Sequence, residues 1–177
     1  MILQFFAPIF GGILFTLLIV PFCIKVARYY KLVDEPYSAP HKTHKHSVPK
    51  AGGIAILSVV LLINLLSGKL WESDTTSILL GATVIFIFGV WDDAKGLSAG
   101  WKLTGQTLAA LLLIWQGIQI KMFGNHPSLN IGITLFWIIG ITNAFNLVDS
   151  MDGLVLGLAA IASTFFLFVT IDAAQLQ

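Results

Sequence analysis

Six long apolar runs, separated by short charged stretches, constrain the fold of this chain more than any other feature of its sequence. A helix that crosses a bilayer needs about 20 mostly apolar residues, and the runs cover approximately residues 3–26, 51–68, 76–91, 103–120, 129–146 and 153–171. They are continuous and show no alternation with period two, so they predict helices and not barrel strands. Charged residues make up only 11% of the chain, against roughly 25% in soluble domains. The sequence therefore predicts an all-α, polytopic membrane helix bundle with about six transmembrane helices.

No soluble segment or internal repeat interrupts the runs, so residues 1–177 are expected to form a single membrane domain. Basic residues indicate its orientation. The connections after the first, third and fifth runs hold most of them, namely Arg28, Lys31, Lys42, Lys45, Lys50, Lys95 and Lys102. The other two connections hold only Lys69 and Lys121 and are expected to be plain connectors. Because Lys and Arg concentrate in cytoplasmic loops, the basic connections are predicted to be cytoplasmic and the N-terminus to lie outside.

The same three connections carry most of the acidic side chains, Asp34, Glu35, Asp92, Asp93, Asp149 and Asp152. Asp92 and Asp93 directly follow the third run, where the negative end of the helix dipole disfavours a carboxylate by a few tenths to about 1 kcal/mol. Helix capping therefore does not explain this pair. A divalent cation, or a phosphate acid to be deprotonated, would explain it. The alternative is an ordinary interfacial turn neutralised by Lys95 and Lys102.

A second polar cluster lies between the fifth and sixth runs. Asn143, Asn146, Asp149 and Asp152 recur every three residues, which on a helical or 3₁₀ path keeps successive side chains near one another. In one interpretation Asp149 is the N-cap of the sixth helix and Asp152 its N3 partner, as in a capping box. Capping does not account for the two asparagines. Together the four residues offer amide donors and carboxylate acceptors suited to a hydrogen-bonding ligand or to the outer shell of a metal.

The first connection combines cations with glycines. Its cationic stretch is suited to holding a phosphate or pyrophosphate and consists of His41, Lys42, His44, Lys45, His46 and Lys50. Three prolines exclude a helix through it, and Gly52 and Gly53 would let the backbone approach a ligand or a neighbouring helix. The alternative is a polybasic loop that serves only topology and contact with anionic lipids. All three clusters on one face favour phosphoryl transfer from a soluble nucleotide-linked donor to a membrane-borne acceptor, with a metal bridging phosphate oxygens.

In chain order, the clusters resemble the three motifs of the polyprenyl-phosphate N-acetylhexosamine-1-phosphate transferases, that is, glycosyltransferase family 4, and most closely its N-acetylglucosamine branch. The first motif is matched by Asp34, Pro36, Lys42, His44, Pro49, Gly52 and Gly53, and the second by Asp92, Asp93, Leu97, Lys102 and Gln106. The third is matched by "NAFNLVDSMDGLVLG". His41 stands where the family usually has Arg, and Ser150 where it has Gly. By this resemblance the chain corresponds to the N-terminal half of the family fold.

The resemblance implies transfer of N-acetylhexosamine 1-phosphate, GlcNAc-1-phosphate above all, from a UDP-N-acetylhexosamine to undecaprenyl phosphate, with release of UMP. This is the first membrane step of cell-envelope polysaccharide synthesis, and it uses Mg²⁺ or Mn²⁺. It implies catalytic and metal-binding roles for Asp92, Asp93 and Asp149. It implies substrate-binding roles for Lys42, His44, Lys45, Gly52, Gly53, Lys102, Asn143, Asn146 and Asp152.

The expected setting is the plasma (inner) membrane, with the active face cytoplasmic. The lipid bilayer is a partner, no nucleic acid is expected, and a homodimer is one option for assembly. Two alternatives remain at the level of the sequence. One is an incomplete, inactive fragment of such an enzyme, and the other is a small ion-binding or transport membrane protein.

Overall fold

The computed structural model describes residues 2–35, 46–149 and 153–175. The elements of this part are six α-helices, one 3₁₀ helix and a two-stranded ribbon. In chain order they are α1 (Ile2–Tyr29), β1 (Val33–Asp34), β2 (Val48–Pro49), α2 (Gly52–Leu66), η1 (Lys69–Trp71), α3 (Ser73–Lys95), α4 (Ala99–Trp115), α5 (Pro127–Val148) and α6 (Leu154–Gln175). The predicted all-α polytopic bundle is confirmed, with one helix for each of the six apolar runs.

The helices differ in their ability to cross a membrane. Four are long and apolar enough, over Phe6–Tyr29, Ser73–Lys95, Pro127–Val148 and Leu154–Ala173. Helix α2 has 15 residues and α4 has 17, fewer than the about 20 that the hydrocarbon core requires. The run at 51–68 extends two residues past the end of α2, and the run at 103–120 begins four residues after the start of α4 and extends five residues past its end. Gly68 and Gly117 adopt the left-handed conformation (φ 73° and 86°) directly after the two helix ends, as is common after helix C-termini.

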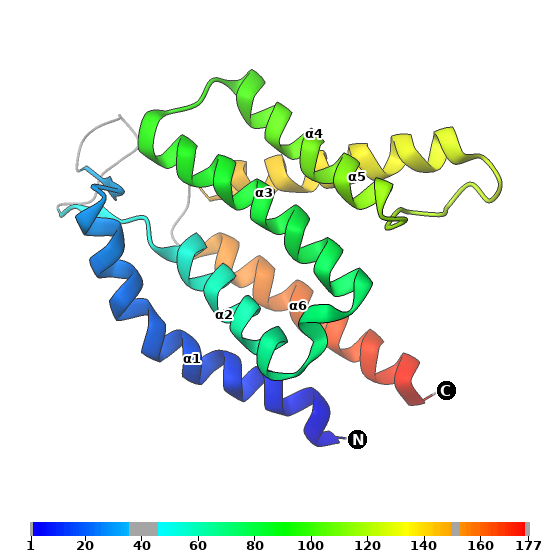
Figure 1. Ribbon diagram of the computed structural model, residues 1–177, viewed down its shortest axis with the longest axis horizontal. Helices are drawn as coiled ribbons and strands as arrows, with labels where there is room; N and C mark the ends of the chain where they lie inside the picture. Colours follow the sequence, from blue (N-terminus) through cyan, green and yellow to red (C-terminus); the bar gives the residue numbers. More distant parts are fainter. Residues whose placement is uncertain (1, 36–45, 150–152, 176–177) are drawn as a thin grey trace.

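The connections with opposite predicted sidedness lie on different sides of the bundle. Figure 1 shows the C-terminal ends of α1, α3 and α5 on the left of the view, beside the β1–β2 ribbon. Both chain termini lie at the lower right, and the α4–α5 connection lies on the right. The described parts of the three charged connections therefore gather at one end of the bundle, as their alternation along the chain predicts.

The end of α1 is fixed by a complete Schellman motif. Lys31 has φ 57°, its N–H donates to the carbonyl of Arg28, and the Leu32 N–H donates to the carbonyl of Ala27. Leu32 then packs into the buried cluster that joins α1 and α2, made of Cys23, Ala27, Leu32, Ala51 and Ala55. This cluster sets the position of the antiparallel ribbon, in which Val33 pairs with Pro49. The sequence analysis predicted a loop here and did not anticipate the ribbon.

Helices α3 and α4 pack closely because α4 has a glycine opposite the large side chain of Phe88 on α3. A Cβ atom on Gly105 would lie 2.4 Å from Cγ of Phe88, far inside van der Waals contact. Gly81 of α3 repeats the arrangement with the roles reversed, since a Cβ there would lie 3.2 Å from Cγ of Leu113. The missing side chains let the two helix axes approach along most of their length.

The α4–α5 connection is held to α5 by side-chain hydrogen bonds and is not the plain connector expected from the sequence. Asn130 and Thr134 of α5 are both 3% exposed. The Asn130 side chain accepts a hydrogen bond from the Phe123 N–H and donates one to the Gly124 carbonyl. The Thr134 hydroxyl accepts from the Ile120 N–H. Two buried polar side chains thus bind the backbone of the connection to α5.

The glycine contact between α3 and α4 predicts the effect of a single methyl group. Gly105→Ala should lower the free energy of unfolding by about 1–3 kcal/mol, because the new methyl group overpacks against the Phe88 ring. Gly100→Ala is the matched control on the same helix, since its Cβ would find its nearest neighbour, Ser98 Oγ, at 3.9 Å. The midpoint of thermal unfolding in detergent measures both. Equal midpoints for the two variants would contradict the packing described for Gly105.

Candidate functional site

The carboxylate pair lies in the last turn of α3, and its two members face different elements. An oxygen of Asp92 lies 2.8 Å from Lys102 Nζ of α4, and the other accepts the Leu97 N–H at 2.7 Å. Asp93 Oδ1 lies 2.9 Å from Nζ of Lys50, the second residue before α2. Each carboxylate therefore has its own lysine, from opposite neighbours of α3.

The sequence offered the interpretation that Lys95 and Lys102 neutralise this turn, and the structure confirms it for Lys102 but not for Lys95. Lys102 does pair with Asp92. Lys95 forms no ion pair within residues 2–35, 46–149 and 153–175, and the cation beside Asp93 is Lys50. A turn neutralised by its own residues would not need a lysine from the segment before α2, so the two ion pairs connect that segment, α3 and α4.

A cavity of about 130 Å³ joins the second and third sequence motifs. It lies between α3, α4 and α5 and is lined by Ile85, Phe88, Gly89, Asp92, Lys102, Gln106, Thr142 and Asn146. Asp92 and Lys102 contribute the charged groups, and Gln106 and Asn146 the amides. They come from three different helices, Asp92 from α3, Lys102 and Gln106 from α4 and Asn146 from α5, so the packing of the helices brings them together.

A pair of amide side chains fixes α4 to α5 beside this cavity. Asn143 Nδ2 donates to Gln106 Oε1 at 2.7 Å and to the Ile139 carbonyl at 2.8 Å. Gln106 Nε2 returns a longer hydrogen bond of 3.4 Å to Asn143 Oδ1. Both hydrogens of the Asn143 amide are thus engaged within the protein. In this arrangement Asn143 orients Gln106, and Asn146, one helical turn further along α5, lines the cavity itself.

The capping interpretation of the Asn/Asp cluster is wrong. Asp149 is the C-cap residue of α5, where its N–H donates to the Phe145 carbonyl. Helix α6 begins at Leu154, and the carbonyl of Gly153 accepts from the Gly157 N–H in its first turn. The apolar run at 129–146 underestimated α5, because the helix continues through the polar residues to Val148. The exposed carboxylate of Asp149 therefore lies at the unfavourable end of a helix dipole.

The glycines of the first motif differ in their surroundings. A Cβ on Gly53 would lie 3.6 Å from the ring of Phe86 on α3, whereas none of the described atoms lies within 4 Å of that position on Gly52. Gly53 thus faces a neighbouring helix and Gly52 faces open space. Four further residues proposed from the sequence, Lys42, His44, Lys45 and Asp152, lie outside the described residues.

The expected metal ligands do not converge in the described part of the chain. Within residues 2–35, 46–149 and 153–175, no group of three or more His, Cys, Asp or Glu side chains is arranged to hold a metal ion. Asp92 and Asp93 instead point toward separate lysines, and Asp149 belongs to the end of a different helix. As arranged, Asp92, Asp93 and Asp149 do not fit a common ion.

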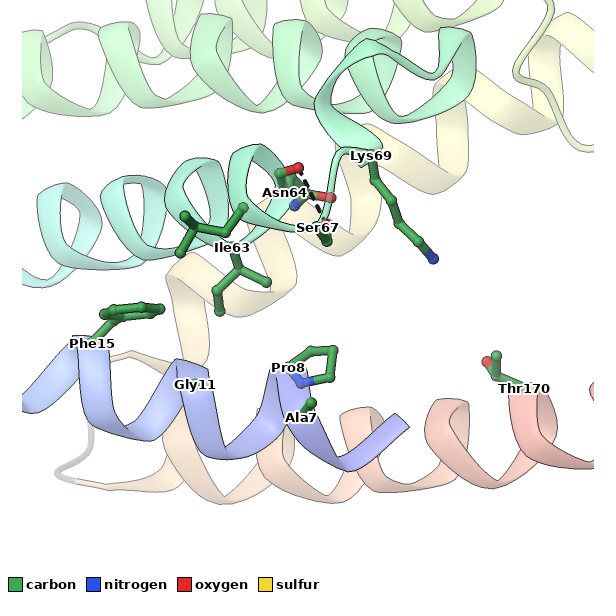
Figure 2. A pocket seen from close by; sticks show the side chains of 10 residues that line it. Ala7, Pro8, Gly11, Phe15, Ile63, Asn64, Ser67, Lys69 and Thr170 are labelled. Carbon is green, nitrogen blue, oxygen red and sulfur yellow. Dashed lines mark hydrogen bonds between the residues drawn. The ribbon is translucent and has the colours of Figure 1, made fainter. Parts of the chain in front are cut away.

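A larger cavity, of about 850 Å³, lies elsewhere, between α1, α2, η1 and α6 (Figure 2). The described residues that line it are mostly apolar and include no carboxylate. The polar groups of its α2 wall are already hydrogen-bonded locally, because Asn64 donates to the Val60 carbonyl and the Ser67 hydroxyl donates to the Asn64 carbonyl. Size alone therefore does not make it the functional site, and the small charged cavity at the end of α3 remains the candidate.

Sequence reasoning assigned no site role to Thr142 and only a motif match to Gln106, and it placed Lys50 in the cationic stretch for phosphate, not beside Asp93. Gln106 and Lys50 stand inside the quoted motifs, Gln106 four residues after Lys102 and Lys50 between Pro49 and the two glycines. The four-residue spacing places Gln106 on the same face of α4 as Lys102, and this periodicity was the available signal. Nothing local to Lys50 indicates its contact with Asp93, because that contact joins the segment before α2 to the end of α3.

These features define a polytopic membrane protein with a charged and amide-lined cavity at one end of its helix bundle. The chain belongs to glycosyl transferase family 4, whose model matches residues 75–177. The matched region contains α3 except for its first two residues, the whole of α4, α5 and α6, and all described residues that line the candidate cavity.

Three curated relatives illustrate the similarity. A Bacillus subtilis (strain 168) protein named "Probable undecaprenyl-phosphate N-acetylglucosaminyl 1-phosphate transferase" is 35% identical over 85% of this chain and 44% of its own length. A phospho-N-acetylmuramoyl-pentapeptide-transferase of Levilactobacillus brevis is 29% identical, over 96% of this chain and 60% of its own length. An undecaprenyl-phosphate alpha-N-acetylglucosaminyl 1-phosphate transferase of Thermotoga maritima is 31% identical, over 77% and 43%. The chain spans about half the length of these relatives. No solved structure matches it.

The position of Asp149 predicts an unusual effect on stability. Asp149→Ala should leave the free energy of unfolding unchanged or raise it by about 0.3–1 kcal/mol, because it removes a negative charge from the negative end of α5. Asp74→Ala is the matched control, since Asp74 lies in the first turn of α3, where the dipole favours it, and its loss should destabilise. Thermal unfolding in detergent measures both. A loss of about 1 kcal/mol for Asp149→Ala would instead indicate a lost helix cap.

Proposed function

We propose that the protein serves the transfer of N-acetylhexosamine 1-phosphate, with GlcNAc-1-phosphate as the preferred group, from a UDP-sugar to undecaprenyl phosphate. The observation that carries this proposal is the shared cavity of Asp92, Lys102 and Asn146, which unites two family motifs at one end of the bundle. The names of the relatives support the reaction class and include both N-acetylglucosaminyl and N-acetylmuramoyl-pentapeptide transferases. The preference for GlcNAc rests on the first motif and on the B. subtilis relative.

The cavity offers the groups that such a transfer needs. In the proposed reaction an oxygen of the lipid phosphate attacks the sugar-bearing phosphorus of the donor, and the bond from that phosphorus to the bridging oxygen breaks, so that UMP leaves. Lys102 supplies a positive charge to the phosphate oxygens, and Asp92 accepts the proton of the attacking phosphate once Lys102 has turned toward substrate. The amide of Asn146 provides a donor and an acceptor for the sugar or the nucleotide, and Gln106 is held at the cavity wall by its hydrogen bonds with Asn143.

The resemblance also implies Mg²⁺ or Mn²⁺, which would neutralise charge on the phosphate oxygens. Because the described carboxylates do not converge on a common ion, no step of the proposed reaction runs through a metal. The proposed setting is the plasma membrane, with the cavity on the cytoplasmic face, supported by the bias of Lys and Arg toward that end. A homodimer stays a prediction that none of these contacts requires.

The alternative of an ion path through the bundle finds no support in the polar side chains of the helices. Thr83 donates to the Leu79 carbonyl of its own helix, and Asn64 donates to the Val60 carbonyl. Gln106 is paired with Asn143. A transport path needs polar groups that face a shared opening near the bilayer midplane, whereas these groups are occupied within or between their own helices.

The proposed function predicts release of UMP from UDP-GlcNAc in membranes. We expect the 177-residue chain alone to insert but to release no UMP above background, because none of the apolar window of α6 is buried and the carboxylates lack a converging set of partners. Co-expression with the C-terminal half of the B. subtilis relative should restore UMP release that depends on undecaprenyl phosphate. Membranes with that half alone are the control. Turnover by the purified chain alone would overturn the need for further helices, and UMP formed without lipid phosphate would overturn the acceptor.

The two carboxylates of α3 predict a graded loss of activity. In the co-expressed system Asp92→Asn should lower the rate of UMP release about 100-fold or more, since it removes a proton acceptor from the cavity. Asp93→Asn should lower it as well, but less, because Asp93 does not line the cavity. Asp74→Asn makes the same change at the opposite end of α3 and should leave the rate unchanged. Near-parental rates for both Asp92→Asn and Asp93→Asn would refute the assignment.

A further inference from the structure

Lys50 has no role in the proposed reaction, yet it forms one of the two ion pairs at the carboxylate cluster. We propose that Lys50 is a positioning residue that acts through Asp93: it holds this carboxylate on the α2 side of α3 and so keeps Asp92 and Lys102 matched in the cavity. The inference rests on the proposed function of that cavity and adds a residue to it.

The backbone of Lys50 is held from both sides. Its N–H donates to the Leu32 carbonyl at 2.9 Å, directly beside the ribbon in which Pro49 pairs with Val33. On its other side, Ala51 is only 6% exposed and belongs to the buried cluster between α1 and α2. The Cα of Lys50 is therefore fixed relative to α1 and α2, and its side chain spans from this fixed point to the end of α3.

Stability alone does not explain the ion pair. The side chains of Lys50 and Asp93 are 31% and 39% exposed, with 2.9 Å between Nζ and Oδ1. Ion pairs with this degree of exposure contribute little to folding, since solvent screens them and ordering two side chains costs entropy. A precise contact of low energetic value between the segment before α2 and the end of α3 is better explained by the position that it gives to the carboxylate.

The contact matters because of the residue next to Asp93. Asp92 and Asp93 are consecutive residues in the last turn of α3. Consecutive residues of an α-helix project about 100° apart, so the same lysine can lie within reach of both carboxylates. Lys102 pairs with Asp92 inside the cavity, while Lys50 draws Asp93 toward the opposite neighbour. Without Lys50, Asp93 would be an unpaired carboxylate beside Lys102 and would compete with Asp92 for it. Lys50 thereby separates two identical groups into one that faces the cavity and one that does not.

The kinetic test uses the co-expressed system and three variants. Lys50→Gln removes the charge and should lower kcat about 10-fold or more, as expected for a misplaced catalytic group, with KM for UDP-GlcNAc changed by less than about threefold. Lys50→Arg keeps the charge and should retain most of kcat. Lys95→Gln is the control. It removes an exposed lysine from the end of α3, the helix that carries Asp93, and should have no effect on kcat or KM.

Three outcomes would overturn the proposal. A raised KM with unchanged kcat would mean that Lys50 contacts the substrate itself. An equal loss for Lys95→Gln would mean that only the general surface charge matters. Failure of Lys50→Arg to retain activity would mean that the charge pair is not what Lys50 provides.

A second measurement does not depend on turnover. A double-mutant cycle of Lys50→Gln, Asp93→Asn and the combined variant, followed by thermal unfolding in detergent, should show a coupling of about 1–2 °C between the two positions. Strictly additive shifts would overturn the contact and the proposal with it. If the parental membranes release no UMP, the proposed function fails, and the cycle still decides whether Lys50 holds Asp93.

Discussion

The contact of the Phe88 ring with Gly105 determines how the charged groups at this end of the bundle meet. Asp92 lies four residues after Phe88 and Lys102 three residues before Gly105, so on each helix the charged residue sits one turn from the contact, on the same face. The absent Cβ of Gly105 lets α4 approach α3 until Lys102 Nζ and an Asp92 oxygen are 2.8 Å apart. Gln106 follows on α4 and carries the contact to α5 through Asn143. One packing contact thus sets an ion pair, a cavity and an amide pair.

The local patterns of the sequence predict the six helices and three of the residues that line the cavity, but not how those residues pair. Asp92, Lys102 and Asn146 stand in recognisable motifs, and the apolar runs place each motif at the same end of the bundle. The partner of Asp93 was not predictable, because Lys50 reaches it from the segment that precedes α2 and no local spacing encodes that contact. The interpretation of Asp149 as the N-cap of α6, one of the two weighed for this cluster, is wrong for a related reason. A carboxylate between two helices satisfies the rules for starting one as well as for following another, and only the backbone path decides.

Adjacent, chemically identical groups acquire different surroundings in this fold because their neighbours come from different directions. Asp92 has α4 beside it and Asp93 has the segment that precedes α2. Asn143 and Asn146 differ in the same way, since the first spends both amide hydrogens on protein acceptors and the second lines the cavity. In both pairs the packing of helices, and not the residue type, separates the group that faces a ligand from the group that supports it.

The connection between α4 and α5 joins these two helices at the end that lies away from the cavity. Asn130 and Thr134 bind the backbone of Ile120, Phe123 and Gly124 to α5, so the connection is a fixed pivot between the two helices. The cavity lies toward the other end of α4. A helix of 17 residues is about 25 Å long, and by that length a rotation of about 5° at the pivot moves its tip by about 2 Å. Such a displacement exceeds the tolerance of a hydrogen bond. The hydrogen bonds of a connection on the opposite side of the bundle therefore help to keep Gln106 of α4 within hydrogen-bonding distance of Asn143 on α5.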